Sequence, residues 1–207
     1  MPAGINTSIF LPPNDPRLQM VASVVTLAEL TSDKLQQDIE RMLQVAYGEQ
    51  SDRKKPLLVG LAAPQIGIPK QIILVDVKAN GKGEVGDLRL YINPEIVEKS
   101  QVEAEWYEGC FSTAQVCGIV SRPATITIKA LDKNGKEIIE KHIDYVARIF
   151  QHEIDHLNGI EFVSHIKVED KLHWVENDEF VIYRNMGGWR NWPNKCTFAK
   201  WQKIKYG

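Results

Sequence analysis

The sequence has 207 residues, of which 43% are hydrophobic and 25% charged, close to the average for soluble globular proteins. Such a length forms one domain with a substantial core and no need of disulfide or metal staples, so a bound metal ion is expected to be functional. The formal net charge of −2 argues against binding of nucleic acid or acidic membranes by bulk charge.

The first part of the chain predicts an arm, a helix and a strand. Asn6 to Arg17 are rich in Pro and polar residues, which is typical of an extended arm. A helix is expected from the N-cap pair Thr31-Ser32 to about Gly48, with apolar residues at helical spacing: Leu35, Ile39, Met42, Leu43 and Ala46. Gln71 to Val77 is a β-branched run that predicts a strand.

Further strands are predicted in the middle of the chain. Leu88 to Ser100 is a strand that Pro94 should make edge-like or bulged. Thr125 to Leu131 alternates between apolar and polar residues, and Asn134-Gly135 leads into a second run, Glu137 to Ile143. Two such runs around an Asn-Gly turn predict a β-hairpin.

A long helix is predicted from about Ile143 to Asn158, with Gly159 where a helix end favours glycine. Its apolar stripe consists of Ile143, Val146, Ala147, Phe150, Ile154 and Leu157. The expected fold class is therefore α+β: antiparallel or mixed β-sheets packed around this central helix, with an N-terminal helix and a C-terminal extension.

The C-terminal segment differs in composition from the rest. From Phe180 to Gly207 there are six basic residues and no Asp or Glu: Arg184, Arg190, Lys195, Lys200, Lys203 and Lys205. Four of the five Trp residues lie from residue 174 to residue 201: Trp174, Trp189, Trp192 and Trp201. We expect a catalytic domain at 1–166 and a basic, Trp-rich extension at 167–207, whose aromatic residues pack onto the body or whose charges contact ribosomal RNA.

Cysteine content and targeting signals bear on location. The three cysteines are an odd number in a long chain and do not form a disulfide framework. The start, Met1 to Asn6, lacks the features of a secretory signal, and no run approaches the ~20 apolar residues that span a bilayer. A cytoplasmic location, with reduced thiols and no membrane partner, is expected.

The long helix contains the pattern H-E-x-x-H at His152, Glu153 and His156. Histidines four residues apart lie one above the other on a helix, so both imidazoles can reach one metal ion with Glu153 at its side. A catalytic site needs a third protein ligand and an open position for water. Spacing alone leaves this ligand open among Cys110, Cys117, Cys196, Glu161, His142 and His165.

Three segments resemble the signature motifs of the peptide deformylase family, in the same order: residues 60–67 (GLAAPQIG), 108–112 (EGCFS) and 151–159 (QHEIDHLNG). The resemblance covers roughly residues 7 to 166. It implies a metal-dependent hydrolase that removes the formyl group from the N-terminal formyl-methionine of new polypeptides.

The resemblance also implies roles for particular residues. Cys110, His152 and His156 would bind one divalent ion, with Fe(II) expected and Zn(II) or Ni(II) as possible occupants. Glu153 would act as general base and then acid, and Gln65 with the backbone N–H of Phe111 would form the oxyanion site. The peptide would add as a strand along Val59, Gly60 and Gly109, with Tyr145 and Ile149 lining the methionine pocket.

The sequence departs from the family pattern at three positions. Leu58 stands where the family has Gly, Phe111 where it has Leu, and Cys117 where many members have Arg. If residues 58–60 run extended, Leu58 lies on the same face as Gly60 and narrows the groove; if it points into the core, it only stabilises the fold.

Two other functions fit parts of the pattern. An H-E-x-x-H zinc endopeptidase would normally use a carboxylate or a histidine as third ligand, against which Cys110 argues. A non-catalytic module stapled by metal would need a fourth protein ligand, such as Cys117, and has no use for Glu153. The expected partners are N-formyl-methionyl peptides and, through the basic tail, the ribosome, but not DNA.

Overall fold

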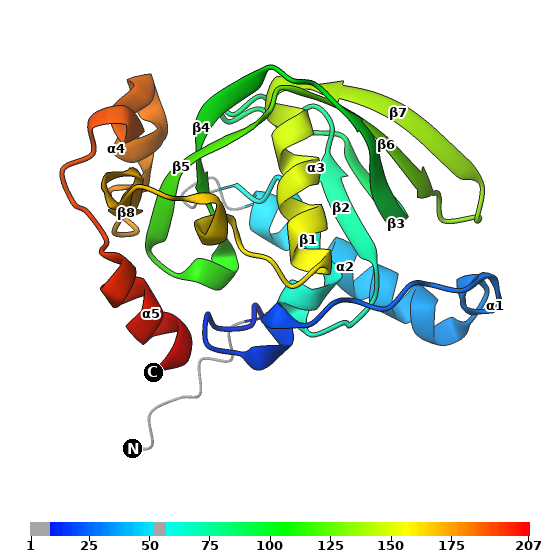
Figure 1. The fold of residues 1–207 in the computed structure, drawn as a ribbon. Coiled ribbons are helices and arrows are strands. Elements are labelled where there is room, and N and C mark those ends of the chain that lie inside the picture. Colours follow the sequence, from blue (N-terminus) through cyan, green and yellow to red (C-terminus); the bar gives the residue numbers. More distant parts are fainter. Residues whose placement is uncertain (1–8, 52–56) are drawn as a thin grey trace.

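A computed structural model describes residues 9–51 and 57–207. The start of the predicted arm, with Met1 to Asn6, lies outside these ranges. The fold is α+β, with a five-stranded sheet in the order β1-β2-β3-β6-β7 and a three-stranded sheet in the order β4-β5-β8 (Figure 1). All strand pairs within the two sheets are antiparallel, which confirms the predicted fold class.

The N-terminal region forms short helices and one long one. The described part of the arm leads into the 3₁₀ turn η1 (Pro16–Gln19) and then into α1 (Leu27–Leu30), which a capping box of Thr26 and Glu29 begins. The predicted helix is α2 (Asp33–Ser51). Its apolar stripe packs against β1 and β2 in a cluster of buried hydrophobic side chains.

The five-stranded sheet contains every strand that the sequence predicted. Its members are β1 (Gly60–Ala62), β2 (Ile72–Asp76), β3 (Leu88–Lys99), β6 (Thr125–Leu131) and β7 (Glu137–Ile143). The bulge expected near Pro94 is present, since the register of β3 against β6 shifts between Ile92 and Glu95. Asn93 adopts a φ of 51° there, and its side chain hydrogen-bonds both the N–H and the carbonyl of Val25.

The three-stranded sheet consists of β4 (Glu103–Gly109), β5 (Val116–Pro123) and β8 (Leu172–Trp174). The apolar pattern of the sequence predicted none of these three strands. Because one face of β4 buries the charged residue Glu108, the sequence of β4 does not show the alternation of apolar and polar residues that identifies a strand.

Helix α3 (Asp144–Leu157) is the predicted long helix and runs between the two sheets (Figure 1). Its buried residues Ala147, Phe150 and Leu157 pack against the five-stranded sheet. Gly159 follows with a φ of 69°, and a Cβ at this glycine would lie 2.4 Å from the carbonyl oxygen of Gln19. Glycine is therefore required at the end of the helix, as expected.

The C-terminal region packs onto both faces of the three-stranded sheet: Tyr183, Trp189 and Trp192 pack with Tyr107 and Cys117 on the face turned away from α3, and Trp201 packs with Val116 and Val120 on the other face. After η4 (Phe162–His165) and η5 (Glu169–Lys171) come β8, α4 (Phe180–Arg184), η6 (Asn185–Asn191) and α5 (Phe198–Tyr206). Trp189, Trp192 and Trp201 are all buried, so these aromatic residues hold the extension on the body as expected. No helix within residues 9–51 and 57–207 is long and apolar enough to cross a membrane.

Candidate metal centre and substrate cleft

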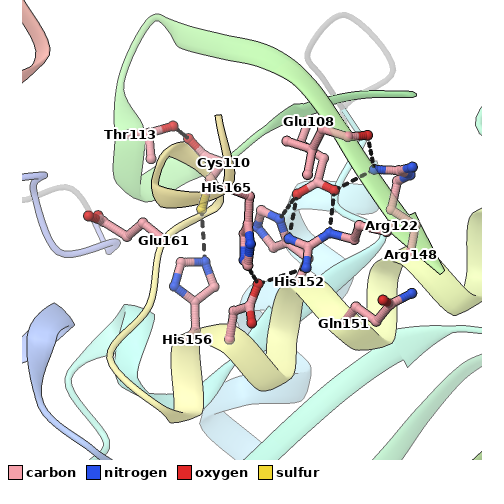
Figure 2. A network of polar contacts seen from close by, with 12 residues as sticks. Glu108, Cys110, Thr113, Arg122, Arg148, Gln151, His152, His156, Glu161 and His165 are labelled. Carbon is pink, nitrogen blue, oxygen red and sulfur yellow. Dashed lines mark hydrogen bonds and ion pairs between the residues drawn. The ribbon is translucent and has the colours of Figure 1, made fainter. Parts of the chain in front are cut away.

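Three side chains of the predicted site converge at the C-terminal half of α3. His152 and His156 lie one turn apart on the helix, and Cys110 follows the last residue of β4. Their ligand atoms all lie within 4.8 Å of one another, and Cys110 Sγ is 3.3 Å from His156 Nε2. Figure 2 shows the Cys110 thiol directed at the His156 imidazole, and the three side chains form the single group of this kind among the described residues.

The other residues that spacing left open as a third ligand lie elsewhere. Cys196 belongs to a hydrophobic cluster, His142 stacks on Phe150, and His165 contacts Asp155. Glu161 is paired with Lys205 at 2.7 Å. Cys117 is buried beneath the extension, and burial raises the pKa of its thiol well above the usual range. None of them belongs to the group that contains Cys110.

A buried carboxylate orients His152. Glu108 Oε2 lies 2.9 Å from His152 Nδ1, and the Glu108 carboxylate also accepts hydrogen bonds from Arg122 at 2.6 and 2.9 Å and from Arg148 at 2.7 Å (Figure 2). Burial raises the pKa of Glu108, but Arg122 and His152 outweigh it and hold this pKa well below its usual range. A charged Glu108 accepts a hydrogen bond from the Nδ1–H of His152, so Nε2 of His152 is left to face the thiol.

Glu153 lies beside the group and is only 4% exposed. Burial raises the pKa of its carboxyl group to about 7. Its Oε2 and the Nδ1 of His156 have no hydrogen-bond partner among the described residues. A buried oxygen without a partner favours a proton donor such as water at this position.

Gly60 is needed at this site for the close packing of α3 against β1. A Cβ at Gly60 would lie 2.4 Å from Glu153 Oε1 and 2.7 Å from Ile149 Cγ2. Glycine therefore allows α3 to approach β1 closely enough for Glu153 to reach the site.

The two residues predicted for the oxyanion site flank Cys110. Gln65 lies in η2 (Ala63–Ile66) and is 3% exposed; its Oε1 accepts from the Ala62 N–H at 2.7 Å and its Nε2 lies 3.1 Å from Cys110 Sγ. Phe111 begins η3 (Phe111–Thr113) directly after Cys110, and its ring stacks on Phe10. The Gln65 amide is thus fixed at one end and directed at the thiol at the other.

A cleft of about 670 Å³ opens over the group. The five residues predicted to contact substrate all line it: Val59, Gly60, Gly109, Tyr145 and Ile149. Four residues of the extension line it as well: Val175, Asn177, Phe180 and Arg184. Sequence reasoning missed these four, because no motif marks them and only the pairing of β8 with β5 brings them to the cleft.

Leu58 borders the cleft, but its side chain is 1% exposed and packs in the core cluster with α2 and β2. The hypothesis that Leu58 narrows the groove is therefore wrong. The alternative, that Leu58 points into the core, is the one that the structure bears out.

Comparisons with known proteins agree with this arrangement. Residues 9–172 match the family described as Polypeptide deformylase. Peptide deformylases of Natranaerobius thermophilus and Rhizobium meliloti are 40% and 36% identical, over 73% and 78% of this chain and 86% and 85% of theirs. Each comparison thus covers most of both chains.

Solved structures give the same result. A class I type b peptide deformylase from Acinetobacter baumannii with Met-Ala-Ser bound superposes with a TM-score of 0.68 at 32% identity, covering 76% of this chain and 96% of that one. An inhibitor complex of the Plasmodium falciparum peptide deformylase gives 0.63 at 32% identity, covering 76% and 88%. With motifs, fold and relatives in agreement, the chain belongs to the polypeptide deformylase family.

Proposed function

We propose that this protein is a metal-dependent hydrolase that removes the N-formyl group from the formyl-methionine of nascent polypeptides and releases formate. The observation that carries the proposal is the convergence of Cys110, His152 and His156 beside Glu153 under the cleft. A thiolate and two imidazoles would supply three protein ligands and no fourth, which is the ligand count of catalytic rather than structural sites.

The donor atoms fit one divalent ion. Cys110 Sγ and the Nε2 atoms of His152 and His156 would hold it, because Nδ1 of His152 is engaged with Glu108. A thiolate with imidazoles suits Fe(II), which we expect as the native ion, and also accommodates Zn(II) or Ni(II). The bound ion supplies Lewis acidity to the formyl carbonyl and to a water molecule.

The chain's own residues then handle protons and charge. Glu153 takes a proton from a water molecule as the water oxygen bonds to the formyl carbon, and the carbonyl π electrons move to the carbonyl oxygen. Gln65 Nε2 and the Phe111 N–H donate to that oxygen. Glu153 returns the proton to the amine nitrogen as the C–N bond breaks, which leaves formate and a free N-terminus.

The peptide is proposed to lie along Val59, Gly60 and Gly109, with the methionine side chain between Tyr145 and Ile149. All five residues line the cleft, and β4, which ends at Gly109, is an edge strand open to a further strand. The bound Met-Ala-Ser of the Acinetobacter baumannii enzyme has methionine in first position, as this arrangement requires.

The two rival functions fit the site less well. An endopeptidase site would favour a carboxylate or histidine where Cys110 lies. A structural metal site would be closed by a fourth protein ligand, and the described part of the chain offers none in this group.

We also propose, from the sequence, a domain boundary between residues 166 and 167 and a contact of the basic extension with the ribosome. The structure removes one residue from the set proposed for that contact. Lys205 is 3% exposed and paired with Glu161, so it is not available to RNA. Arg190, Lys195, Lys200 and Lys203 are exposed. We expect the protein to co-sediment with ribosomes at low salt and to lose this binding at high salt or when the charges at these four positions are removed. Binding that is unchanged by added salt and by removal of the charges would contradict the contact.

The activity is tested with anaerobically purified protein and two peptides, formyl-Met-Ala-Ser and acetyl-Met-Ala-Ser. We expect equal release of formate and free amine from the first and no release from the second, because the extra methyl group must fit where the formyl hydrogen lies. Release of neither formate nor amine would overturn the proposal.

A further inference from the structure

We propose that the C-terminal extension forms one wall of the substrate cleft and that Arg184 on this wall binds a carboxylate of the peptide beyond formyl-methionine. This inference rests on the proposed deformylase activity. It assigns substrate selection to a residue that lies beyond the 9–172 stretch matched by the family.

The path of the extension brings it to the free edge of β4. β8 pairs with β5, so the segment after it crosses the face of the three-stranded sheet that is turned away from α3. On this face Tyr107 of β4 packs against Tyr183 at 5.3 Å and Phe180 at 6.5 Å between ring centroids. The residues of α4 thus reach the strand along which the peptide is proposed to lie.

Phe180 and Arg184 share the face of α4 that is turned to the cleft. They lie four residues apart, hence on one side of the helix, and both line the cleft. A Cβ at Gly109 would lie 3.6 Å from the Phe180 ring, so Phe180 covers the glycine at which the peptide passes. Arg184 lies one turn further along this wall.

The charge of Arg184 is not used within the described residues. Arg184 is half-buried, and its guanidinium has no ion pair or hydrogen bond there. The cleft's other arginine, Arg148, donates hydrogen bonds to Glu108 and to the carbonyls of Val120 and Ala104. Burial raises the pKa of Tyr107 and Tyr145, and Arg184 opposes the rise in both, in keeping with a guanidinium near the two phenols.

A peptide carboxylate is the ligand that this position fits. Tyr107 precedes Gly109 by two residues, which corresponds to about 7 Å along a strand. Arg184 beside Tyr107 is therefore within reach of the residues that follow methionine in an extended peptide. A guanidinium prefers a carboxylate, with which it forms paired charge-assisted hydrogen bonds.

The test compares peptides that differ only in charge. Values of kcat/KM are measured at low salt for formyl-Met-Glu-Ser-amide against formyl-Met-Gln-Ser-amide and for formyl-Met-Ala-Glu-amide against formyl-Met-Ala-Gln-amide. Formyl-Met-Ala-Ser with a free C-terminus, against its amide, separates a terminal carboxylate from an acidic side chain. Within each pair the ratio does not depend on the fraction of active enzyme, so a partly unfolded variant remains informative.

We expect the wild-type protein to favour the acidic member of at least one pair by roughly threefold to tenfold, with the preference falling as salt is added. Arg184→Gln should abolish or invert the preference, because Glu49 and Glu84 still line the cleft. Arg184→Lys should retain part of it, and Arg184→Glu should favour a lysine peptide instead. The matched control is Arg190→Gln, because Arg190 stacks on Trp189 away from the cleft and should leave the ratios unchanged.

Two results would overturn this inference and leave the proposed function intact. One is that the wild-type protein deformylates the acidic and neutral members of every pair equally well. The other is that a preference for the acidic member survives in Arg184→Gln. Failure to deformylate any of the peptides would instead overturn the proposed function, and this inference with it.

Discussion

At the scale of single residues, the site depends on neighbours that fix the reacting groups. Glu108 holds His152 through Nδ1, and Gly60 lets Glu153 approach from α3. The sequence identified His152, Glu153 and His156 through their spacing on a helix. It did not identify Glu108 as the partner of His152, because 44 residues separate them and only the pairing of β4 with β5 brings Glu108 under the helix.

Glu153→Gln tests the proton transfer. The amide is close in size to the carboxyl group but cannot accept and return a proton, so activity should fall by at least ~10²-fold. Metal content should stay at the wild-type level, because Glu153 is outside the ligand group. Turnover near the wild-type rate in metal-replete Glu153→Gln would remove this residue from the mechanism.

Gly60→Ala tests the close approach of α3 to β1. The added methyl group would displace Glu153 and Ile149, so kcat/KM should fall by at least tenfold and overpacking should cost about 1–3 kcal/mol of unfolding free energy. Gly48→Ala is the control: Gly48 lies in α2 with nothing within 4 Å of the added Cβ, so it should gain roughly 0.5–1 kcal/mol at unchanged activity. Full activity in Gly60→Ala would show that this packing does not position the base.

At the scale of elements, the predictions succeeded where apolar residues follow a regular period. The residues of α2, α3 and the β6–β7 hairpin repeat at helical or strand spacing, and all three form as expected. The strand β4 escaped prediction because it buries Glu108 toward two arginines. The sequence of a strand that contributes to a buried ion cluster is as rich in charged residues as that of a solvent-exposed segment. Only the three-dimensional contacts of the charged side chains distinguish the two cases.

A buried ion pair fastens the last helix. Lys205 of α5 and Glu161 are 3% and 9% exposed, and their charged atoms lie 2.7 Å apart. Removing one partner leaves the other charge buried without a partner. Lys205→Met should therefore lower the free energy of unfolding, measured by urea denaturation, by roughly 3–5 kcal/mol. The double variant Glu161→Leu/Lys205→Met should recover most of this loss. If the double variant were no more stable than Lys205→Met, the unpaired buried charge would not be the cause of the lost stability.

At the scale of the whole molecule, the extension is joined to the catalytic body by β8 and by a cluster of aromatic side chains. Composition predicted that the tryptophans pack, but not that Trp189 and Trp192 pack on the outer face of β4 and β5 while Trp201 packs on the opposite face. That result depends on long-range strand pairing, which no local pattern encodes.

The extension should also make stability depend on pH. His173 of β8 is fully buried beside Tyr183 and Lys195, and burial with the charge of Lys195 lowers its pKa to about 4. The unfolded chain, with a histidine pKa near 6.5, binds more protons between these values, so stability should fall as pH drops from about 6.5 to 4. Urea unfolding of the wild-type protein and His173→Gln should show a shallower fall in the variant. Equal falls would contradict the lowered pKa.

The central claim is that Cys110, His152 and His156 hold the catalytic ion, and metal analysis of five folded variants tests it most directly. Cys110→Ser, His152→Ala and His156→Ala should each lose most of the bound metal, because each removes one of three ligands. Cys117→Ser and Cys196→Ser should keep it, since both thiols lie outside the group. Retention by Cys110→Ser together with loss in Cys117→Ser would show that the ion is held by the other thiol.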